Sequence, residues 1–172
     1  MINQDILENQ AKIVFLAIGS NLGNRKKNIE KAKFFLHQNK IKFISVSKYY
    51  ETPSWPNSKY PKYLNIILKV ECTLGPLDLL KICKQIEINL GRKNSFKNSP
   101  RLCDIDIIDY NGMNIRIKNN LHIPDQRLHK RNFVLIPLFD IEKNWVHPTK
   151  KLDITTLISF LPKDDITSIK QI

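Results

Sequence analysis

With 172 residues, the chain has the size of one domain and is long enough to bury a core without disulfides or structural metals. Hydrophobic residues make up 42% and charged residues 26%, no apolar run approaches the ~20 residues that cross a bilayer, and no signal peptide is visible; this excludes a membrane protein and predicts a cytoplasmic one. The charge is unusual, because 28 Lys and Arg against 16 Asp and Glu give a net charge of +12. Such a surface attracts nucleic acid or a small phosphorylated substrate, although the scattered lysines equally fit a bias in composition.

The organisation of the chain indicates a single domain over residues 1–172, with no internal repeat and no linker. Residues 1–11 are polar and predict a flexible or accessory lead-in. The cysteines Cys72, Cys83 and Cys103 form no CxxC pair, so we expect reduced thiols in the core rather than a disulfide framework or a zinc site. We also expect a monomer.

In the first half of the chain, segments with the apolar pattern of a strand alternate with a segment that has the apolar period of a helix. The segments with such a pattern are a strand at 12–18, a helix at 24–37, and strands at 42–50 and 63–73. Gly19 ends the first strand in a turn, and Asn24 can cap the helix. Three prolines predict an irregular loop at 51–62.

The second half continues in the same way. Its expected elements are a helix at 76–90, strands at 102–110 and 114–117, and helices at 131–141 and 154–160. Pro76 suits the first turn of its helix, and Gly91 is a typical residue just after a helix end. Asn111-Gly112 is a hairpin signal between the two strands.

The order of these elements predicts the fold class. Strand, helix, strand, strand, helix and strand are followed by further elements at the C-terminal end. This is the pattern of an α+β protein with a ferredoxin-like βαββαβ core, in which an antiparallel sheet carries both helices on one face, with C-terminal additions.

Asp104 and Asp106 are the first candidate site. In a strand, residues two apart lie on one face, ~6.6 Å apart along the chain, so the two carboxylates project together. Their spacing suits hard cations such as Mg²⁺, which bind one or two protein carboxylates, water and substrate phosphate. On the pattern alone, which is short and common, a solvated strand face with two ordinary acids is the favoured interpretation.

The context of the pair favours phosphate chemistry. Arg101 lies three residues before the first acid, and the preceding loop contains Arg92, Lys93 and Lys97. Arginine forks next to metal-binding carboxylates stabilise charge on phosphate oxygens. The loop by itself also fits a flexible basic surface.

A second cluster, of hydroxyl, amide and aromatic side chains, lies on either side of the proline-containing loop. Its segments are Thr52-Pro53-Ser54-Trp55 and Tyr63-Leu64-Asn65. Such groups can recognise a flat heterocycle by edge hydrogen bonds and stacking. A tyrosine at the position of Tyr63 is more often simply a residue of the core or of a strand edge, whereas an amide such as Asn65 within an apolar strand needs a partner if it is buried.

Taken together, these segments resemble one family, the 6-hydroxymethyl-7,8-dihydropterin pyrophosphokinases of folate biosynthesis. The matching segments occur in the family's order from about residue 13 to 161: Ala17-Ile18-Gly19-Ser20-Asn21-Leu22-Gly23, Thr52-Pro53, Tyr63-Leu64-Asn65, Ile86-Glu87, Gly91-Arg92, Pro100-Arg101-Leu102-Cys103-Asp104-Ile105-Asp106 and Arg131-Asn132-Phe133-Val134-Leu135-Ile136-Pro137-Leu138. Each segment is weak evidence alone, but the ordered set is strong.

The resemblance implies transfer of pyrophosphate from ATP to the hydroxymethyl group of the pterin, with release of AMP. It implies two Mg²⁺ ions on Asp104 and Asp106. The implied catalytic residues are Arg92, Arg101, Asp104 and Asp106. The implied contacts to ATP are Glu87, Arg92, Arg101 and Arg131. The implied pterin site comprises Thr52, Pro53, Trp55, Tyr63, Asn65 and Phe133, with Tyr63 and Phe133 on the two faces of the ring.

Three positions depart from the pattern of many family members. They are Asn98-Ser99 in place of Trp-Gly, Asn94 in place of Arg, and Asp125 in place of His. Phe96 can substitute for the missing Trp as a lid residue, and His122 or His129 for the missing His. We expect these changes to alter affinity and loop closure rather than remove the reaction.

Two other functions remain as alternatives. The +12 charge and the four-stranded sheet also fit an RNA-binding module, but such modules have aromatic side chains on the central strands where this chain has Asp104 and Asp106. The altered loop also fits a family member with impaired catalysis. Formation of AMP separates these alternatives from an active enzyme.

Overall fold

The computed structural model describes residues 10–55, 57–92, 99–117 and 121–172. Most of the expected lead-in and the positions Asn94, Phe96 and Asn98 therefore lie outside the described residues. The elements are β1 (Lys12–Ser20), α2 (Arg25–Gln38), β2 (Lys42–Val46), β3 (Tyr50–Thr52), β4 (Tyr63–Cys72), α3 (Pro76–Asn89), β5 (Asp104–Tyr110), β6 (Ile115–Ile117), β7 (Leu121–Ile123), the 3₁₀ turn η1 (Leu128–Lys130), α4 (Asn132–Ile141), α5 (Ile154–Ser159), α6 (Lys163–Ser168) and β8 (Lys170–Gln171).

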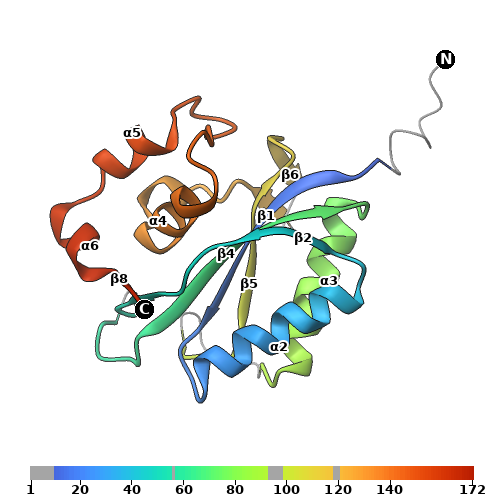
Figure 1. Ribbon diagram of the computed structural model, residues 1–172, viewed down its shortest axis with the longest axis horizontal. Coiled ribbons are helices and arrows are strands. Elements are labelled where there is room, and N and C mark those ends of the chain that lie inside the picture. The colour runs from blue at the N-terminus through green and yellow to red at the C-terminus, as the bar shows by residue number, and fades with distance from the viewer. Residues whose placement is uncertain (1–9, 56, 93–98, 118–120) are drawn as a thin grey trace.

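The architecture is α+β, with an antiparallel sheet as its centre (Figure 1). The strand order is β5-β1-β4-β3-β8, and β2 also pairs with β4. The longest pairing joins β1 to β4, from Lys12 opposite Cys72 to Ser20 opposite Leu64. These central strands hold the sheet together, and both are almost wholly buried.

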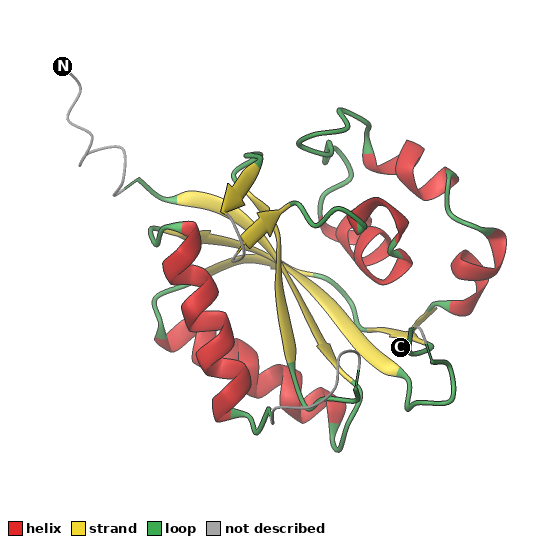
Figure 2. Ribbon diagram, turned by 180° about the vertical axis from the view of Figure 1, so that it is seen from behind, coloured by secondary structure: helices red, strands yellow, loops and turns green. Residues whose placement is uncertain are grey.

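Side-chain alternation divides the core between the two faces of the sheet. Val14, Leu16 and Ile18 of β1 lie in a cluster with residues of α2 and α3. Phe15 and Ala17, which point the opposite way, pack in a second cluster with residues of α4 and α5. Figures 1 and 2 show α2 and α3 on one side of the sheet and α4 to α6 on the other. The expected additions at the C-terminal end thus cover the second face.

The predicted ends of the first two helices are confirmed. The side chain of Asn24 accepts a hydrogen bond from the Lys27 backbone N–H and caps α2. Pro76 occupies the first turn of α3. Gly91 has φ +95°, the left-handed conformation that a residue after a helix end adopts at low cost when it has no Cβ.

The predicted strand at 42–50 is divided into β2 and β3. The register against β4 shifts between Phe43 and Ser45, which marks a bulge. At Ser47 the hydroxyl accepts a hydrogen bond from the Ile67 N–H (2.9 Å), a role that a backbone carbonyl has in a regular ladder. The side chain of Asp140 in turn accepts the Lys48 N–H (2.8 Å). The ladder is therefore interrupted before it resumes at β3.

The predicted hairpin at Asn111-Gly112 is wrong in its pairing. Both residues have positive φ, +53° and +69°, as a tight turn requires. The following strand β6, however, pairs with β7 and not with β5. The Asn111 N–H bonds to the carbonyl of Ile13 (2.7 Å) and the Gly112 N–H to the side chain of Asp109 (2.7 Å), so the turn closes onto β1.

The end of the chain contains more structure than the sequence indicates. The helices expected at 131–141 and 154–160 are present as α4 and α5, while α6 and β8 were not predicted. β8 adds two residues to the edge of β3. The three cysteines are free and buried, as expected. No helix in the described parts of the chain is long and apolar enough to cross a bilayer.

Candidate functional site

One end of the sheet brings the two predicted clusters together. Gly19 of β1 lies opposite Asp104 of β5 on one side and opposite Asn65 of β4 on the other. Because neighbouring strands are ~4.8 Å apart, the backbones of Asp104 and Asn65 are roughly 10 Å apart. Residues directly opposite each other share a face, so these two polar side chains project from the same side of the sheet.

That side is the face covered by α4. Ile67, two residues after Asn65, and Ile108, two after Asp106, lie in the cluster with α4 and α5. Where α4 begins, the apolar residues of this face give way to Asp104, Asp106 and Asn65. The fold thus leaves a polar end on a sheet face whose middle is closed by a helix.

The alternation predicted for β5 is confirmed. Cys103, Ile105 and Ile107 lie in the core with α2 and α3. Asp104 and Asp106 project the other way, with 27% and 47% of their side-chain surface exposed. The two carboxylates are therefore accessible from solvent and attached to a strand that pairs with β1 and is anchored in the core by its alternate residues.

The pKa of Asp106 is raised above its ordinary value. Burial of the carboxyl group, and next the negative charge of Asp104, raise the pKa of Asp106 to about 6. Two acids that share a site repel each other, and a bound cation relieves this repulsion. Among the described residues, no group of three or more His, Cys, Asp or Glu could hold a metal ion by itself, so a cation on this pair would take its other ligands from water or a bound molecule.

Three arginines surround the pair. Arg101 Nη1 lies 2.9 Å and Arg92 Nη1 3.2 Å from Asp104 Oδ1. Arg131 Nη1 lies 3.8 Å from Asp106 Oδ2. These guanidinium groups keep between 18% and 32% of their side-chain surface exposed, so they can also face a bound anion.

Glu87 requires a correction. The sequence predicts a contact to ATP, but the side chain is 0% exposed. One oxygen accepts the Ile105 N–H (2.7 Å) and the ammonium of Lys84 (2.9 Å), and the other pairs with Arg92. Because Glu87 has no surface for a ligand, its place is beneath the site, where it fixes Arg92 and the start of β5.

The second cluster is built around a hydrogen bond between two buried side chains. Asn65 donates its amide to the hydroxyl of Thr52 (3.0 Å), and the exposed fractions are 7% and 3%. Thr52 lies opposite Tyr63 in the pairing of β3 and β4. A Cβ on Gly19 would lie 3.0 Å from Asn65 Oδ1 and 3.3 Å from Tyr63 Cδ1, so the absence of a side chain at Gly19 leaves room for both.

Asn21 is a central residue of the site that is not among the residues predicted from the sequence. It is 2% exposed and donates its amide to Ser54 Oγ (3.1 Å) and to the carbonyl of Pro61 (3.1 Å). Its oxygen accepts the Arg101 N–H (2.7 Å), and its own N–H bonds to the Arg101 carbonyl (3.1 Å). One amide thus ties the loop of the second cluster to the loop that precedes the carboxylates. In the sequence, this amide stands between Gly19 and Gly23, but no pattern there indicates its hydrogen-bond partners.

The remaining predicted residues lie around this centre. Trp55 is 66% exposed and its ring faces the guanidinium of Arg127, 5.7 Å away. Phe133, in the first turn of α4, is half-buried, and its ring lies 5.8 Å from the guanidinium of Arg131. Pro53, next to the buried Thr52, is exposed.

The two histidines expected to replace the missing family histidine lie on β7 and in η1. His122 is exposed on β7, which pairs with β6. The ring of His129 packs against that of His147, with centroids 6.4 Å apart. The position itself, Asp125, lies 3.4 Å from Arg131.

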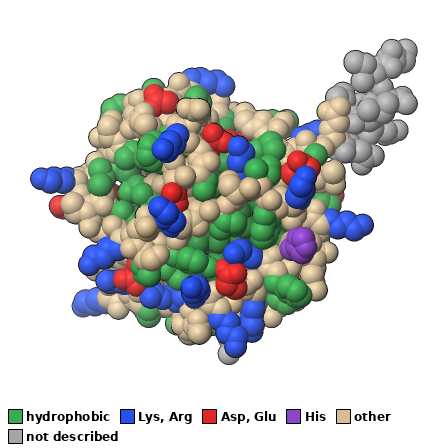
Figure 3. Space-filling view, viewed as in Figure 1, with side chains coloured by type: hydrophobic (Ala, Val, Ile, Leu, Met, Phe, Trp, Pro, Cys, Tyr) green, Lys and Arg blue, Asp and Glu red, His purple; other side chains and the backbone are tan. Residues whose placement is uncertain are grey.

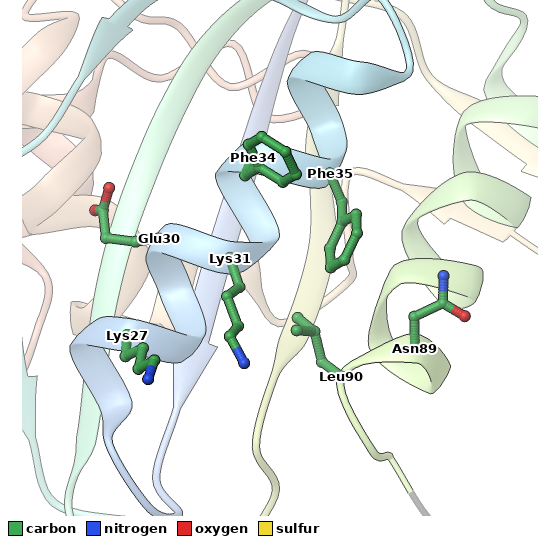
Figure 4. A pocket seen from close by; sticks show the side chains of 7 residues that line it. All are labelled: Lys27, Glu30, Lys31, Phe34, Phe35, Asn89 and Leu90. Atoms are coloured by element: carbon green, nitrogen blue, oxygen red, sulfur yellow. The ribbon is translucent and has the colours of Figure 1, made fainter.

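A groove of ~460 Å³ lies between α2 and α3, away from the two clusters (Figure 4). Phe35 and Leu90 point toward one another there, next to the lysines Lys27 and Lys31. It contains none of the predicted site residues and lies on the sheet face opposite to the carboxylates.

Similar proteins point to one family. A family model described as 7,8-dihydro-6-hydroxymethylpterin-pyrophosphokinase (HPPK) matches residues 15–143. The 2-amino-4-hydroxy-6-hydroxymethyldihydropteridine pyrophosphokinase of Aquifex aeolicus is 41% identical over 139 residues, which are 78% of this chain and 83% of that protein. The folic acid synthesis protein FOL1 of Dictyostelium discoideum is 46% identical over 145 residues. The match covers 84% of this chain but 21% of FOL1, so the chain spans only a fifth of that relative.

The fold is likewise similar to a solved structure. The crystal structure of Plasmodium falciparum HPPK-DHPS with pteroate matches 95% of this chain and 46% of its own, with a TM-score of 0.76. The identity is 17%, so this likeness is one of fold alone.

Proposed function

Because the chain belongs to the 7,8-dihydro-6-hydroxymethylpterin-pyrophosphokinase family, we propose that it transfers pyrophosphate from ATP to the hydroxymethyl group of 6-hydroxymethyl-7,8-dihydropterin, releasing AMP in folate biosynthesis. The observation that carries the proposal is the row Asp104, Gly19 and Asn65 across three strands. It puts a carboxylate pair with three arginines beside an amide–hydroxyl cluster. Two substrates of different chemistry, a polyphosphate and a flat heterocycle, thus have adjacent sites.

The carboxylate pair fits Mg²⁺. Asp104 and Asp106 offer two partly exposed carboxylates on one face of the sheet. We propose that the pair holds two ions. When bound, they would neutralise phosphate oxygens and help to align the attacking hydroxyl.

Arg92 and Arg101 would bind the phosphate oxygens directly, in addition to the Mg²⁺ ions. Arg92 and Arg101 converge on Asp104, so their forks are held in place before a nucleotide arrives. A planar guanidinium matches the oxygens of a phosphate in a bidentate manner and stabilises charge that develops during transfer. Glu87 contributes by orienting Arg92 from below. This reaction needs positioning and charge neutralisation, and no covalent nucleophile.

The amide–hydroxyl cluster would recognise the pterin. Asn65 and Thr52, fixed by their mutual hydrogen bond, can meet the polar edge of the ring. The aromatic side chains that would stack on its faces are Tyr63 and Phe133. Pro53 and Trp55, exposed on the adjoining loop, would close the outer side of the site.

An assay for AMP tests the proposal. The folded chain, incubated with Mg²⁺, ATP and 6-hydroxymethyl-7,8-dihydropterin, should release one AMP for each pterin pyrophosphate formed. Release of ADP alone, or no turnover by correctly folded protein, would overturn it. The same assay excludes or supports a catalytically impaired family member.

Gly19→Ala should weaken pterin binding by about tenfold, since the new Cβ would push Asn65 and Tyr63 from their places. Binding of an ATP analogue should change little. The matched control is Gly75→Ala, because a Cβ at Gly75 meets nothing within 4 Å and the backbone there is extended, with φ −63°. Fluorescence titration with a pterin measures the effect, and equal affinities for Gly19→Ala and the wild type would contradict the assignment of this cluster.

The RNA-binding alternative finds no support in the geometry. Asp104 and Asp106 occupy the strand face that would have to meet RNA phosphates, and carboxylates repel these. In Figure 3, Lys and Arg side chains are dispersed over the visible face among acidic and apolar ones. This supports the interpretation of the +12 charge as a bias in composition.

We also propose that the core of the chain is ferredoxin-like. The order β5-β1-β4-β3, with α2 and α3 on one face, supports a ferredoxin-like core. The two clusters share the same central strands, which supports one domain over 1–172. We propose that this domain acts as a monomer, because the residues assigned to both substrates come from one chain.

A further inference from the structure

Arg131 lies between two carboxylates. Its Nη1 is 3.8 Å from Asp106 Oδ2, and its Nη2 is 3.4 Å from Asp125 Oδ2. The residue stands where η1 ends and α4 begins, and its guanidinium also lies 5.8 Å from the ring centre of Phe133. The side chain is only 20% exposed, so these neighbours decide where the charge points.

Asp125 is itself fixed by the backbone that follows it. Its Oδ1 accepts the Arg127 N–H (2.7 Å), and its carbonyl accepts the Leu128 N–H (3.0 Å). A side chain that bonds its own backbone two residues on forms an Asx turn, which holds one carboxylate oxygen in place. The other oxygen, Oδ2, is then directed at Arg131.

We propose that Asp125 is a positioning residue that keeps Arg131 beside the carboxylate pair when Mg²⁺ and nucleotide occupy the site. The inference rests on the proposed function. With its charge neutralised by a bound divalent cation, Asp106 would attract the guanidinium of Arg131, 3.8 Å away, much more weakly. Once Asp106 is engaged, Asp125 is the carboxylate that still holds Arg131, and the arginine is presented to phosphate oxygens.

The opposite role makes a different prediction. If Asp125 only competed with phosphate for Arg131, removing its charge would free the arginine and tighten nucleotide binding. If Asp125 positions Arg131, the same change leaves a long side chain to search among its rotamers, and binding weakens. The sign of the effect therefore separates the two roles.

The test is the binding of a non-hydrolysable ATP analogue in the presence of Mg²⁺, measured by calorimetry on the full chain. Asp125→Asn should weaken binding by about five- to tenfold, and Asp125→Glu should restore part of the loss. Arg131→Gln should weaken it further. The double variant should bind no worse than Arg131→Gln alone, because Asp125 acts through Arg131. Pterin binding should be unchanged in Asp125→Asn.

The matched control is Asp78→Asn, which removes an exposed carboxylate paired with Lys81 at 2.9 Å on α3 and should bind as the wild type does. Tighter or unchanged binding by Asp125→Asn, or additive losses in the double variant, would overturn the inference alone. A folded wild type that binds no nucleotide would overturn both this inference and the proposed function. If the effects of the Asp125 and Arg131 substitutions on nucleotide binding are coupled but the chain forms no AMP, only the proposed function is overturned.

Discussion

Asp106→Asn should lower kcat by about 10³ while leaving the fold intact. The amide keeps the shape of the side chain but removes the charge that would hold the cation, and the loss of one such electrostatic contribution typically has an effect of this size. Stability should change by no more than ~0.5 kcal/mol, because the side chain is 47% exposed and its loss relieves repulsion with Asp104. Initial rates of AMP formation and thermal unfolding measure the two effects.

Two further variants sharpen this result. Asp104→Asn should lose both rate and stability, because Arg101 and Arg92 would lose a shared acceptor in a partly buried place. Asp78→Asn, in the exposed first turn of α3 and at the opposite end of that helix from Glu87, removes the same charge and should keep the wild-type rate. If Asp106→Asn turns over like the wild type, the pair does not bind the catalytic metal.

The central strands and first two helices could be predicted because their signals are local. The period of two in β5 places Asp104 and Asp106 on one face whatever the rest of the chain does. Likewise, Asn24 is seen to cap α2 by a contact three residues away. Such contacts lie within the range over which a sequence pattern acts.

The parts that could not be predicted depend on partners distant in the sequence. Asn21 bonds to Ser54 and Arg101, which are 33 and 80 residues away, so no local pattern announces that it joins two loops. Glu87 resembles an exposed acid at a helix end, and only the arrival of the Ile105 N–H and Arg92 at its two oxygens explains its burial. The strand β6 was expected to pair with β5 because the turn residues are right, but turn chemistry does not fix which strand is the partner.

His147 should make the stability of the protein depend on pH in the acid range. The ring is 2% exposed, and its Nδ1 accepts the N–H groups of Thr149 and Lys150, both at 3.3 Å. Burial, and then the neighbouring positive groups of His129 and Lys150, lower the pKa of His147 from 6.5 to about 4. Protonation would also turn Nδ1 into a donor that faces two other donors.

The sign follows from proton binding. The unfolded chain takes up a proton at His147 near pH 6.5, whereas the folded chain resists it down to about pH 4, so the unfolded state holds more protons within this interval. The contribution to the free energy of unfolding is therefore complete above pH 6.5 and falls by about 3 kcal/mol as the pH is lowered to 4. In a chain of this size, such a loss lowers Tm by about 6–12 °C.

His147→Asn isolates this contribution, because the amide oxygen can accept the same N–H groups but does not titrate. Its absolute stability should be lower, owing to lost packing with Trp145 and His129. The difference in Tm between the wild type and the variant should shrink as the pH falls from 7 to 4. Because this difference is taken at each pH, the contributions of the carboxylates that both proteins share cancel. His122→Asn, at an exposed position on β7, should follow the wild-type curve. Parallel curves for His147→Asn and the wild type would show that the buried ring is not what makes the fold sensitive to acid.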